Sequence, residues 1–474
     1  MSMKRIYAIL LFLAGWTGLH AQSESVNILL NDPVTRDANI SVCIRDLKTG
    51  KVIDAYRSNS LVTPASTIKT LTTATALEMF GGDYRIPTFI EYSGTISNGV
   101  LYGNIYIRGN GDPMLGNLKD GQAFLNLWVR RIHDAGIRDI RGKVVADMSF
   151  FDGDALNPGW VWEDAGNFYA PSVFALSYMD NTMNIVLHSG AVGSVATVLH
   201  TYPEVPGVIF ENHIRCTTID YDGAYVHGVP YNNVRYLTGS IPSNLGQFGV
   251  CGDMPNPGLL LAQHLTKHLR YAGITVAEEA GYITEADKVM RTLIYRHESQ
   301  PLREIVKRTN LYSVNLYAET LYRLFASKIS VPCTLHNAEN VLRNFWRNRA
   351  VDIRSAIIKD GCGLSPVDAI SAQSLVQLMT YMYNSTEKDA FYASLPVSAT
   401  SGTLSGFLVG TELAGRVHAK SGTIDGTKNY AGYIELPDGN RWVFAVLDNN
   451  AQGKPKHIMR VIERYLIDVY HRNK

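Results

Sequence analysis

The sequence has few cysteines and no excess of charge of either sign. Five cysteines occur among 474 residues, and none forms the Cys-x-x-Cys pair that zinc and thioredoxin-like sites use. The odd count leaves at least one thiol unpaired within a monomer, and the spacing leaves open whether Cys216 and Cys251 are bridged. Lys and Arg total 44 and Asp and Glu total 43, so the net charge of +1 excludes the basic surface of a nucleic-acid-binding protein.

Long apolar runs are absent except near the N-terminus. The apolar stretch 6–16 follows Lys4 and Arg5 and precedes the Leu-His-Ala sequence at 19–21. This order is typical of a secretory signal peptide, so we expect residues 1–21 to be removed on export to the periplasm. A buried N-terminal helix is the alternative interpretation. No later stretch reaches the ~18 apolar residues that span a bilayer, and we expect no transmembrane segment after cleavage.

The hydrophobic pattern predicts strands and helices at both ends of the chain. Strand patterns at 40–44 and 52–56 flank a turn with glycine and predict a β-hairpin. Helical spacing over 66–80 follows and stops at two glycines. The last third of the chain carries further predicted elements: helices 302–309, 314–327, 336–346, 371–383 and 456–470, and strands 416–420, 429–435 and 441–448.

The middle of the chain has a different character. Strand-like runs and glycine turns alternate there with only a few helical stretches, among them 122–135 and 259–271. The length is enough for roughly three domains. We therefore expect a mixed α/β (α+β) catalytic domain that is discontinuous, made of 22–83 and 297–474, and interrupted by a β-rich insertion at 84–296 with one or two lobes.

The sequence Ser-Thr-Ile-Lys places the hydroxyl of Ser66 and the amine of Lys69 three residues apart at the start of the predicted helix. Residues with this spacing lie on the same face of a helix. Serine is a weak nucleophile at neutral pH, and a desolvated lysine with a lowered pKa can accept its proton. The spacing alone is weak support for catalysis, because a solvated lysine on a helix surface produces the same pattern.

Two further motifs strengthen the catalytic interpretation. Ser313-Val314-Asn315 precedes a predicted helix, and Lys420-Ser421-Gly422-Thr423 ends a predicted strand. The order S-x-x-K, S-x-N and K-[ST]-G is that of penicillin-binding proteins and class A β-lactamases. The literal Lys48-Thr49-Gly50 string precedes Ser66, in the wrong order, and is interpreted as a hairpin turn.

The resemblance covers nearly the whole chain after the signal peptide and narrows to one family. The sequence resembles the class C low-molecular-mass penicillin-binding proteins, which are D-alanyl-D-alanine carboxypeptidases and endopeptidases. The matching segments are Arg108-Gly109-Asn110-Gly111-Asp112-Pro113, Trp160-Val161-Trp162-Glu163-Asp164, Tyr169-Ala170-Pro171, Asp180-Asn181, Lys359-Asp360-Gly361-Cys362-Gly363-Leu364-Ser365, Ser401-Gly402-Thr403-Leu404 and Gly415-Arg416. The resemblance implies a serine β-lactamase/transpeptidase-like catalytic domain with a large β-rich insertion.

The resemblance also implies roles for the motif residues. Ser66 would attack the carbonyl of the penultimate D-Ala of a peptidoglycan stem while Lys69 accepts its proton, and water would hydrolyse the acyl-enzyme. Ser313 would relay the proton to the leaving nitrogen, and Asn315 would bind the substrate amide. The alternative interpretation is that both residues only cap a helix.

The Lys-Ser-Gly-Thr motif is expected to bind the substrate's end. Lys420 would attract the terminal carboxylate and lower the pKa of Lys69, and Ser421 would donate to the same carboxylate. Backbone N–H groups of Ser66 and Thr423 would form the oxyanion hole. Asp164 would hold the amine of a diamino acid in the stem, or act as a structural hydrogen-bonded residue.

Two positions depart from the family pattern. Cys362 replaces the serine usual in the Asp-Gly-Ser-Gly turn, and Pro366 stands where many relatives carry an arginine that grips the substrate's free end. Alternative functions are a β-lactamase or a cell-wall-binding protein without turnover. We expect β-lactams to inhibit the enzyme. No cofactor or metal is expected, and His264 and His268 lack the glutamate of a His-Glu-x-x-His zinc motif.

Overall fold

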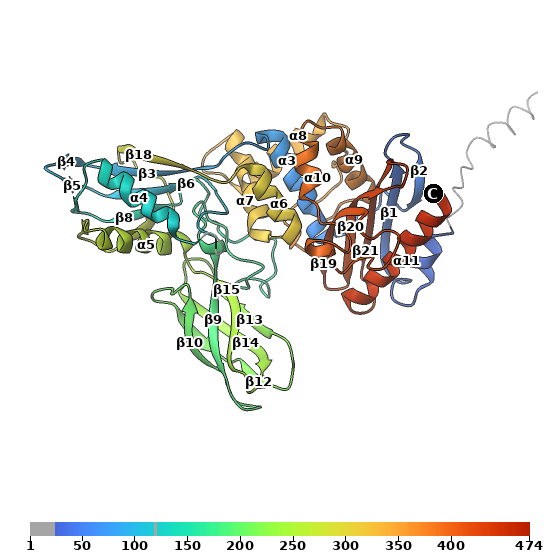
Figure 1. Cartoon of the computed structure of the whole chain (residues 1–474), viewed down its shortest axis with the longest axis horizontal. Coiled ribbons are helices and arrows are strands. Elements are labelled where there is room, and N and C mark those ends of the chain that lie inside the picture. The colour runs from blue at the N-terminus through green and yellow to red at the C-terminus, as the bar shows by residue number, and fades with distance from the viewer. Residues whose placement is uncertain (1–23, 118–120) are drawn as a thin grey trace, which may run out of the picture.

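A computed structural model describes residues 24–117 and 121–474. The predicted signal peptide lies outside these residues. Figure 1 shows three regions: a catalytic lobe of helices around a sheet at one end, a second α/β lobe at the other end, and a lobe of strands below the middle. Within the described ranges, no helix is long and apolar enough to cross a membrane.

The sheet of the catalytic lobe joins the two ends of the chain. Its five strands are antiparallel and lie in the order β19-β20-β21-β1-β2. Their bounds are β1 (Asn39–Asp46), β2 (Val52–Tyr56), β19 (Val417–Ile424), β20 (Thr427–Glu435) and β21 (Arg441–Asn449). The predicted hairpin and the three predicted C-terminal strands are thus confirmed.

Both faces of this sheet are buried, which explains the continuous apolar run of β21. Phe444 and Val446 pack in the cluster that contains residues of α2 and α11, whereas Ala445 and Leu447 pack in the large cluster that contains residues of α3 and α9. The helices of the lobe are α2 (Val26–Asn31), α3 (Lys69–Phe80), α6 (Leu302–Tyr312), α7 (Asn315–Leu324), α8 (Leu335–Arg347), α9 (Ala372–Tyr383), α10 (Lys388–Ser394) and α11 (Pro455–Asn473). The short α10 has no counterpart among the predicted elements.

The far lobe consists of two sheets and two helices. One sheet has the order β17-β8-β6-β3-β18 and the other β16-β7-β5-β4. The bounds are β3 (Pro87–Ser93), β4 (Thr95–Ser97), β5 (Val100–Tyr102), β6 (Ile105–Gly109), β7 (Asp139–Ile140), β8 (Val144–Asp147), β16 (Thr275–Val276), β17 (Gly281–Ile283), β18 (Arg291–Glu298), α4 (Ala123–Asp134) and α5 (Pro257–Tyr271). Both helices were predicted within two residues of these bounds.

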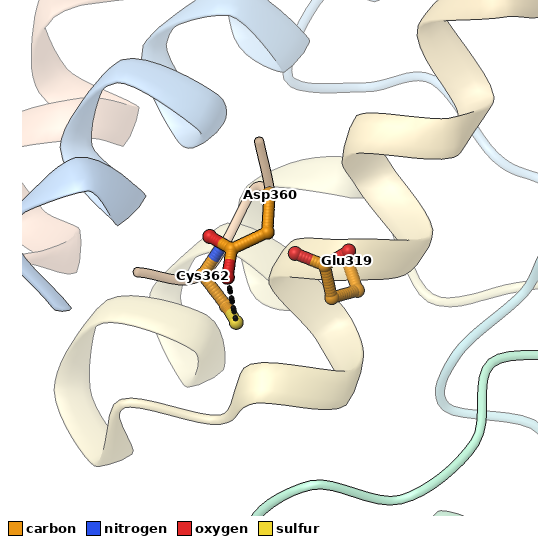
Figure 2. Close-up of side chains that lie close together, drawn as sticks. All are labelled: Glu319, Asp360 and Cys362. Atoms are coloured by element: carbon orange, nitrogen blue, oxygen red, sulfur yellow. Dashed lines mark hydrogen bonds between the residues drawn. The ribbon is translucent and has the colours of Figure 1, made fainter. Parts of the chain in front are cut away.

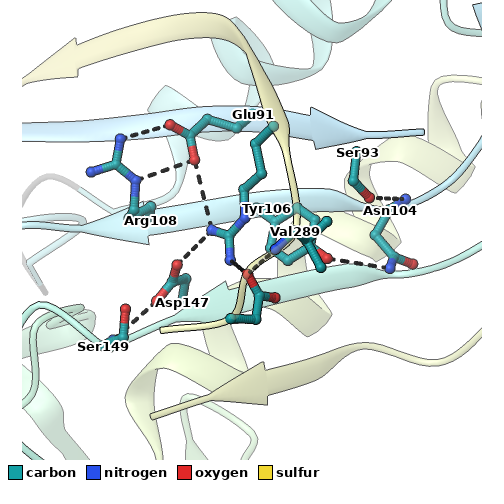
Figure 3. A network of polar contacts seen from close by, with 10 residues as sticks. Glu91, Ser93, Asn104, Tyr106, Arg108, Asp147, Ser149 and Val289 are labelled. Carbon is teal, nitrogen blue, oxygen red and sulfur yellow. Dashed lines mark hydrogen bonds and ion pairs between the residues drawn. The ribbon is translucent and has the colours of Figure 1, made fainter. Parts of the chain in front are cut away.

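A network of ion pairs ties four strands of the far lobe together (Figure 3). Arg108 on β6 pairs with Glu91 on β3 at 2.6 Å. Arg291 on β18 pairs with Asp147 on β8 at 2.5 Å and contacts Glu91 at 3.7 Å. Because β18 is the last strand before the chain returns to the catalytic lobe, these contacts hold the returning strand in its place.

The lobe of strands contains a three-stranded and a four-stranded sheet, and we call it the β lobe. Its bounds are β9 (Thr182–Ser189), β10 (Thr197–Tyr202), β11 (Ile209–Asn212), β12 (Arg215–Thr217), β13 (Gly223–His227), β14 (Val234–Pro242) and β15 (Gly246–Asp253). A buried ion pair of 2.7 Å joins Arg235 and Asp253 in its core. All five cysteines are free thiols, so Cys216 and Cys251 are not bridged. The predicted mixed α/β architecture with a β-rich insertion is confirmed.

Candidate active site

Ser66 lies in the tight first turn of the helix predicted at 66–80. The turn Ala65–Ile68 is a 3₁₀-helix, and the α-helix α3 begins at Lys69. Lys69 Nζ lies 2.8 Å from Ser66 Oγ. The residue before the serine, Ala65, has φ of 46°, a conformation that a non-glycine residue rarely adopts. The turn thus holds the serine hydroxyl directly against the amine.

The hydrogen bonds of Lys69 determine which way its lone pair points. Nζ lies 2.5 Å from Asn315 Oδ1 and 2.6 Å from the Cys362 carbonyl oxygen. Asn315 Nδ2 donates to the Tyr169 carbonyl oxygen at 2.7 Å, which fixes the amide so that Oδ1 faces the lysine. A neutral amine has two N–H groups, and these two acceptors use both. The lone pair is therefore left facing the hydroxyl of Ser66.

The environment of Lys69 favours this neutral form. Its side chain is completely buried, and burial lowers the pKa of the amine, although the charges of Asp360 and Glu319 oppose the shift. Burial, and not the charge of Lys420, is the largest cause. A lysine with a lowered pKa can act as a base toward serine near neutral pH.

Ser313 and Lys420 form the second polar pair of the site. Ser313 ends α6 with φ of 59° and turns its hydroxyl toward Lys420 Nζ at 2.9 Å. Burial lowers the pKa of Lys420 well below its usual value, and the charge of Lys69 adds to this shift. Neither Ser313 nor Asn315 caps α7, whose N-cap residue is Val314 and has no side-chain capping bond. Helix capping thus does not explain these two side chains.

Strand β19 passes directly beside the serine turn. A Cβ atom on Gly422 would lie 2.6 Å from the Pro64 carbonyl oxygen and 3.1 Å from the Ser66 nitrogen, so only glycine fits. This close approach places the backbone before Thr423 beside the Ser66 N–H group. Ser421 Oγ donates to Thr403 Oγ1 at 2.8 Å, a partner that the sequence patterns did not identify.

The turn 360–365 supplies the carbonyl oxygen that holds Lys69, and Asp360 builds it. One carboxylate oxygen of Asp360 accepts from the Cys362 and Gly363 nitrogens, and the other from the Leu364 and Ser365 nitrogens. A Cβ on Gly363 would lie 1.9 Å from the Ala65 carbonyl oxygen, which shows how tightly this turn packs on the serine turn. The lysine contacts the main chain of Cys362, so the exchange of serine for cysteine removes no group from the site.

Cys362 and Asp360 lie beside Glu319 in the buried core behind the turn (Figure 2). The three side chains offer oxygen and sulfur atoms within 4.8 Å of one another, as metal ligands would. Glu319 accepts from the Gly361 nitrogen at 2.5 Å, however, and burial together with the Asp360 charge raises its pKa to about 7. Burial also raises the pKa of the Cys362 thiol. These groups form a hydrogen-bonded core and not an open set of ligands.

Asp164 lies on the loop of the insertion that touches Asn315. Its carboxylate accepts from the Tyr169 hydroxyl at 3.0 Å, and burial raises its pKa. His264 lies elsewhere, where the Tyr178 hydroxyl is 2.8 Å from its Nδ1 and burial lowers its pKa to about 4. His268 Nδ1 lies 3.1 Å from an asparagine side chain. These contacts give both histidines structural partners.

Comparison with known proteins places this chain in a family. The model of the D-Ala-D-Ala carboxypeptidase 3 (S13) family matches residues 22–468. A D-alanyl-D-alanine carboxypeptidase of an Actinomadura species is 25% identical over 450 residues, which cover 91% of this chain and 81% of that protein.

Solved structures show the same fold. Penicillin binding protein 4 of Haemophilus influenzae has a TM-score of 0.82 at 20% identity, covering 95% of this chain and 99% of that one. The same protein complexed with a β-lactam has a TM-score of 0.77. A predatory peptidoglycan endopeptidase of Bdellovibrio bacteriovorus has a TM-score of 0.50 at 15% identity, with 92% and 94% covered. The predicted family is confirmed: this chain is a serine-type peptidase of the D-Ala-D-Ala carboxypeptidase S13 family.

Proposed function

We propose that the enzyme hydrolyses D-alanyl-D-alanine ends and cross-links of peptidoglycan stem peptides through an acyl-enzyme on Ser66. The observation that carries the proposal is the position of Lys69 Nζ, which lies 2.8 Å from Ser66 Oγ and is held by Asn315 Oδ1 and the Cys362 carbonyl oxygen. In the neutral amine this arrangement turns the lone pair toward the serine hydroxyl. The names of the related proteins agree with this substrate class.

The first half of the reaction forms the ester. Lys69 takes the proton of Ser66, whose oxygen bonds to the carbonyl carbon of the penultimate D-Ala. The negative charge that develops on the carbonyl oxygen is stabilised by the N–H groups of Ser66 and Thr423. The bond to the leaving nitrogen then breaks as Ser313 gives its hydroxyl proton to that nitrogen, and Ser313 recovers the proton that Lys69 took, so the Lys69 amine is neutral again.

The second half returns the free enzyme. Water loses a proton to the Lys69 amine and attacks the ester carbonyl, and the Ser66 oxygen leaves by taking that proton back from the Lys69 ammonium. A carboxypeptidase releases a single D-Ala in the first half, whereas an endopeptidase releases the stem that was cross-linked through its side-chain amine. The same bond changes therefore serve both reactions.

Strand β19 binds the C-terminal carboxylate of the substrate. Lys420 attracts the terminal carboxylate and Ser421 donates a hydroxyl to it. Asp164 holds the amine of a diamino acid in the stem, since its carboxylate lies on the loop that touches Asn315. Pro366 offers no cation, and the carboxylate of a bound substrate would favour the protonated form of Lys420.

We also propose how the chain is organised. Residues 22–83 and 297–474 form the catalytic domain, and 84–296 form the insertion with two lobes. Residues 1–21 direct the protein to the periplasm, where peptidoglycan lies.

The test is the intact mass of the purified protein over time after mixing with benzylpenicillin, with Ser66→Ala as the control. A persistent adduct that is absent from the variant supports the proposal, and release of D-Ala from muropeptides then completes it. An adduct that disappears while the drug is destroyed identifies a β-lactamase instead. No adduct identifies a cell-wall-binding protein without turnover.

A further inference from the structure

A strip of exposed aromatic side chains lies on the β lobe. The aromatic strip consists of five rings that are linked in neighbouring pairs, with centroids 5.0 to 6.5 Å apart: Trp162, Tyr225, His227, Tyr236 and His213. Trp162 is 68% exposed, and Tyr225 and Tyr236 are each 42% exposed. Large rings usually bury most of their area, so a group of exposed rings marks a binding surface.

Sheet geometry aligns these rings. Tyr225 and His227 are two residues apart on β13 and share one face, and Tyr236 lies opposite His227 on β14. The ring planes of Trp162 and Tyr225 lie within 11° and 14° of the His227 plane, with centroids 6.4 and 6.3 Å away. Three rings thus share nearly one orientation.

The chemistry of the strip points to a neutral ligand with hydroxyl groups. None of its five side chains carries a fixed charge, and its polar atoms are the indole N–H, the tyrosine hydroxyls and the imidazole nitrogens at the ring edges. The apolar face of a pyranose ring fits the aromatic faces, and its hydroxyls fit those edges. A phosphate-rich polymer or an anionic membrane would instead require lysine or arginine.

One loop links the strip to the candidate active site. Trp162 belongs to the loop that ends at Tyr169, whose carbonyl oxygen binds Asn315. The same loop is bonded to β13, because the Val226 nitrogen donates to Asn167 Oδ1 at 3.1 Å, and the Gly228 nitrogen just after the strand donates to the Ala165 carbonyl oxygen at 3.2 Å. Burial and Asp164 raise the pKa of the Tyr169 hydroxyl, and Tyr225 is close enough to add a smaller contribution. One loop therefore connects the exposed rings with the catalytic helix α7.

We propose that the aromatic strip is a subsite for the glycan strand of peptidoglycan, whose N-acetylated pyranose rings stack on Trp162, Tyr225 and Tyr236. The inference rests on the proposed function, because a stem peptide that reaches Ser66 is covalently attached to this glycan. An extended stem spans only ~3.3 Å per residue, so the glycan must lie on a surface near the site. Binding of the glycan would keep the enzyme on the polymer between hydrolysed stems.

The test measures retention on glycan strands that an amidase has freed of all stem peptides and that are then coupled to beads. We expect the full protein to pellet with this glycan and the variants Trp162→Ala and Tyr225→Ala to bind about tenfold more weakly. The matched control is Tyr271→Ala, which removes a ring that is 78% exposed at the end of α5 and should bind like the unchanged protein. Acylation by benzylpenicillin, which contains no sugar, reports that the variants are folded.

The outcomes separate this proposal from the proposed function. The strip proposal is overturned if the unchanged protein does not pellet with stem-free glycan, or if Trp162→Ala pellets equally well. It is also overturned if the unchanged protein does not bind glycan but binds phosphatidylglycerol vesicles or associates with itself through the strip. The strip variants would then lose vesicle binding or self-association. Failure of the proposed function appears separately, as the absence of a penicillin adduct on Ser66 while glycan retention persists.

Discussion

Asn315 Nδ2 donates a hydrogen bond of 2.7 Å to the carbonyl oxygen of Tyr169. This contact joins the first residue of α7 to a loop of the insertion, far away in the sequence. It decides the orientation of the Asn315 amide, and thereby directs Oδ1 to Lys69 at 2.5 Å. The insertion thus takes part in orienting the base of the catalytic centre.

Replacement of Asn315 tests this orientation. In Asn315→Ala the amine of Lys69 loses one of its two fixed acceptors, and its lone pair no longer points steadily at Ser66. We expect acylation by benzylpenicillin to slow by about 100-fold, within the range of general-base catalysis. Stopped-flow acylation measures this, with Asn340→Ala on an exposed face of α8 as the control. A decrease of less than threefold would contradict the orientation argument.

The pH dependence of acylation tests the state of Lys69. Burial lowers the pKa of its amine below 10.5, and proton transfer from Ser66 requires the neutral form. The acylation rate should therefore rise with pH through the lowered pKa and reach a plateau before pH 10.5. Acylation rates measured across buffers give the apparent value, which belongs to the coupled pair of Lys69 and Lys420. A rate that still rises at pH 10.5 would show that the pKa is not lowered.

Gly422→Ala tests the close approach of β19 to the serine turn. The new Cβ would lie 2.6 Å from the Pro64 carbonyl oxygen, so the strand must move away from Ser66. We expect a loss of about 1–3 kcal/mol in the free energy of unfolding and a decrease in acylation of more than tenfold. Gly406→Ala, whose Cβ meets no atom within 4 Å, should leave both unchanged. Urea unfolding and penicillin labelling provide the two measurements.

Glu319 should make folding stability depend on pH. Its pKa is raised from 4.5 to about 7, so in this window the folded protein binds a proton that the unfolded chain releases. Its contribution to the free energy of unfolding is therefore complete below pH 4.5 and is lost as the pH rises through about 7. Urea midpoints of Glu319→Gln should decline less over this range than those of the unchanged protein. Parallel curves would contradict the raised pKa.

The buried ion pair of Arg235 and Asp253 predicts a stability effect in the β lobe. Both side chains are completely buried, and Arg235 Nε lies 2.7 Å from Asp253 Oδ1. Asp253→Ala leaves an unpaired guanidinium in the core, and we expect it to cost about 3–5 kcal/mol of unfolding free energy. The control is Glu278→Ala, which removes the partner of Lys143 in an exposed ion pair and should cost less than about 1 kcal/mol. A similar effect of both variants on thermal unfolding would contradict the prediction.

Much of the catalytic lobe could be predicted because its signals are local. Helical spacing and the following glycines placed α3, and the alternating or continuous apolar runs placed β1, β2 and β19 to β21. The residue order Ser66, Ser313 and Lys420 indicated the family. For the insertion, only a β-rich character was predicted, and its individual strands were not. The pairing of these strands depends on long-range register. The short α10 was missed because it has only seven residues.

The sequence by itself determined which chemical groups are present and in what order. They are a serine followed by a lysine three residues later, a second serine followed by an asparagine two residues later, and a lysine followed by a serine and a glycine on a strand. Only the tertiary structure decided that the Cys362 and Tyr169 carbonyl oxygens orient the base, that Thr403 meets Ser421, and that one loop links the aromatic strip to the catalytic helix. The physical reason is that burial and main-chain hydrogen bonds between distant segments depend on how the whole chain packs, and no local pattern encodes them.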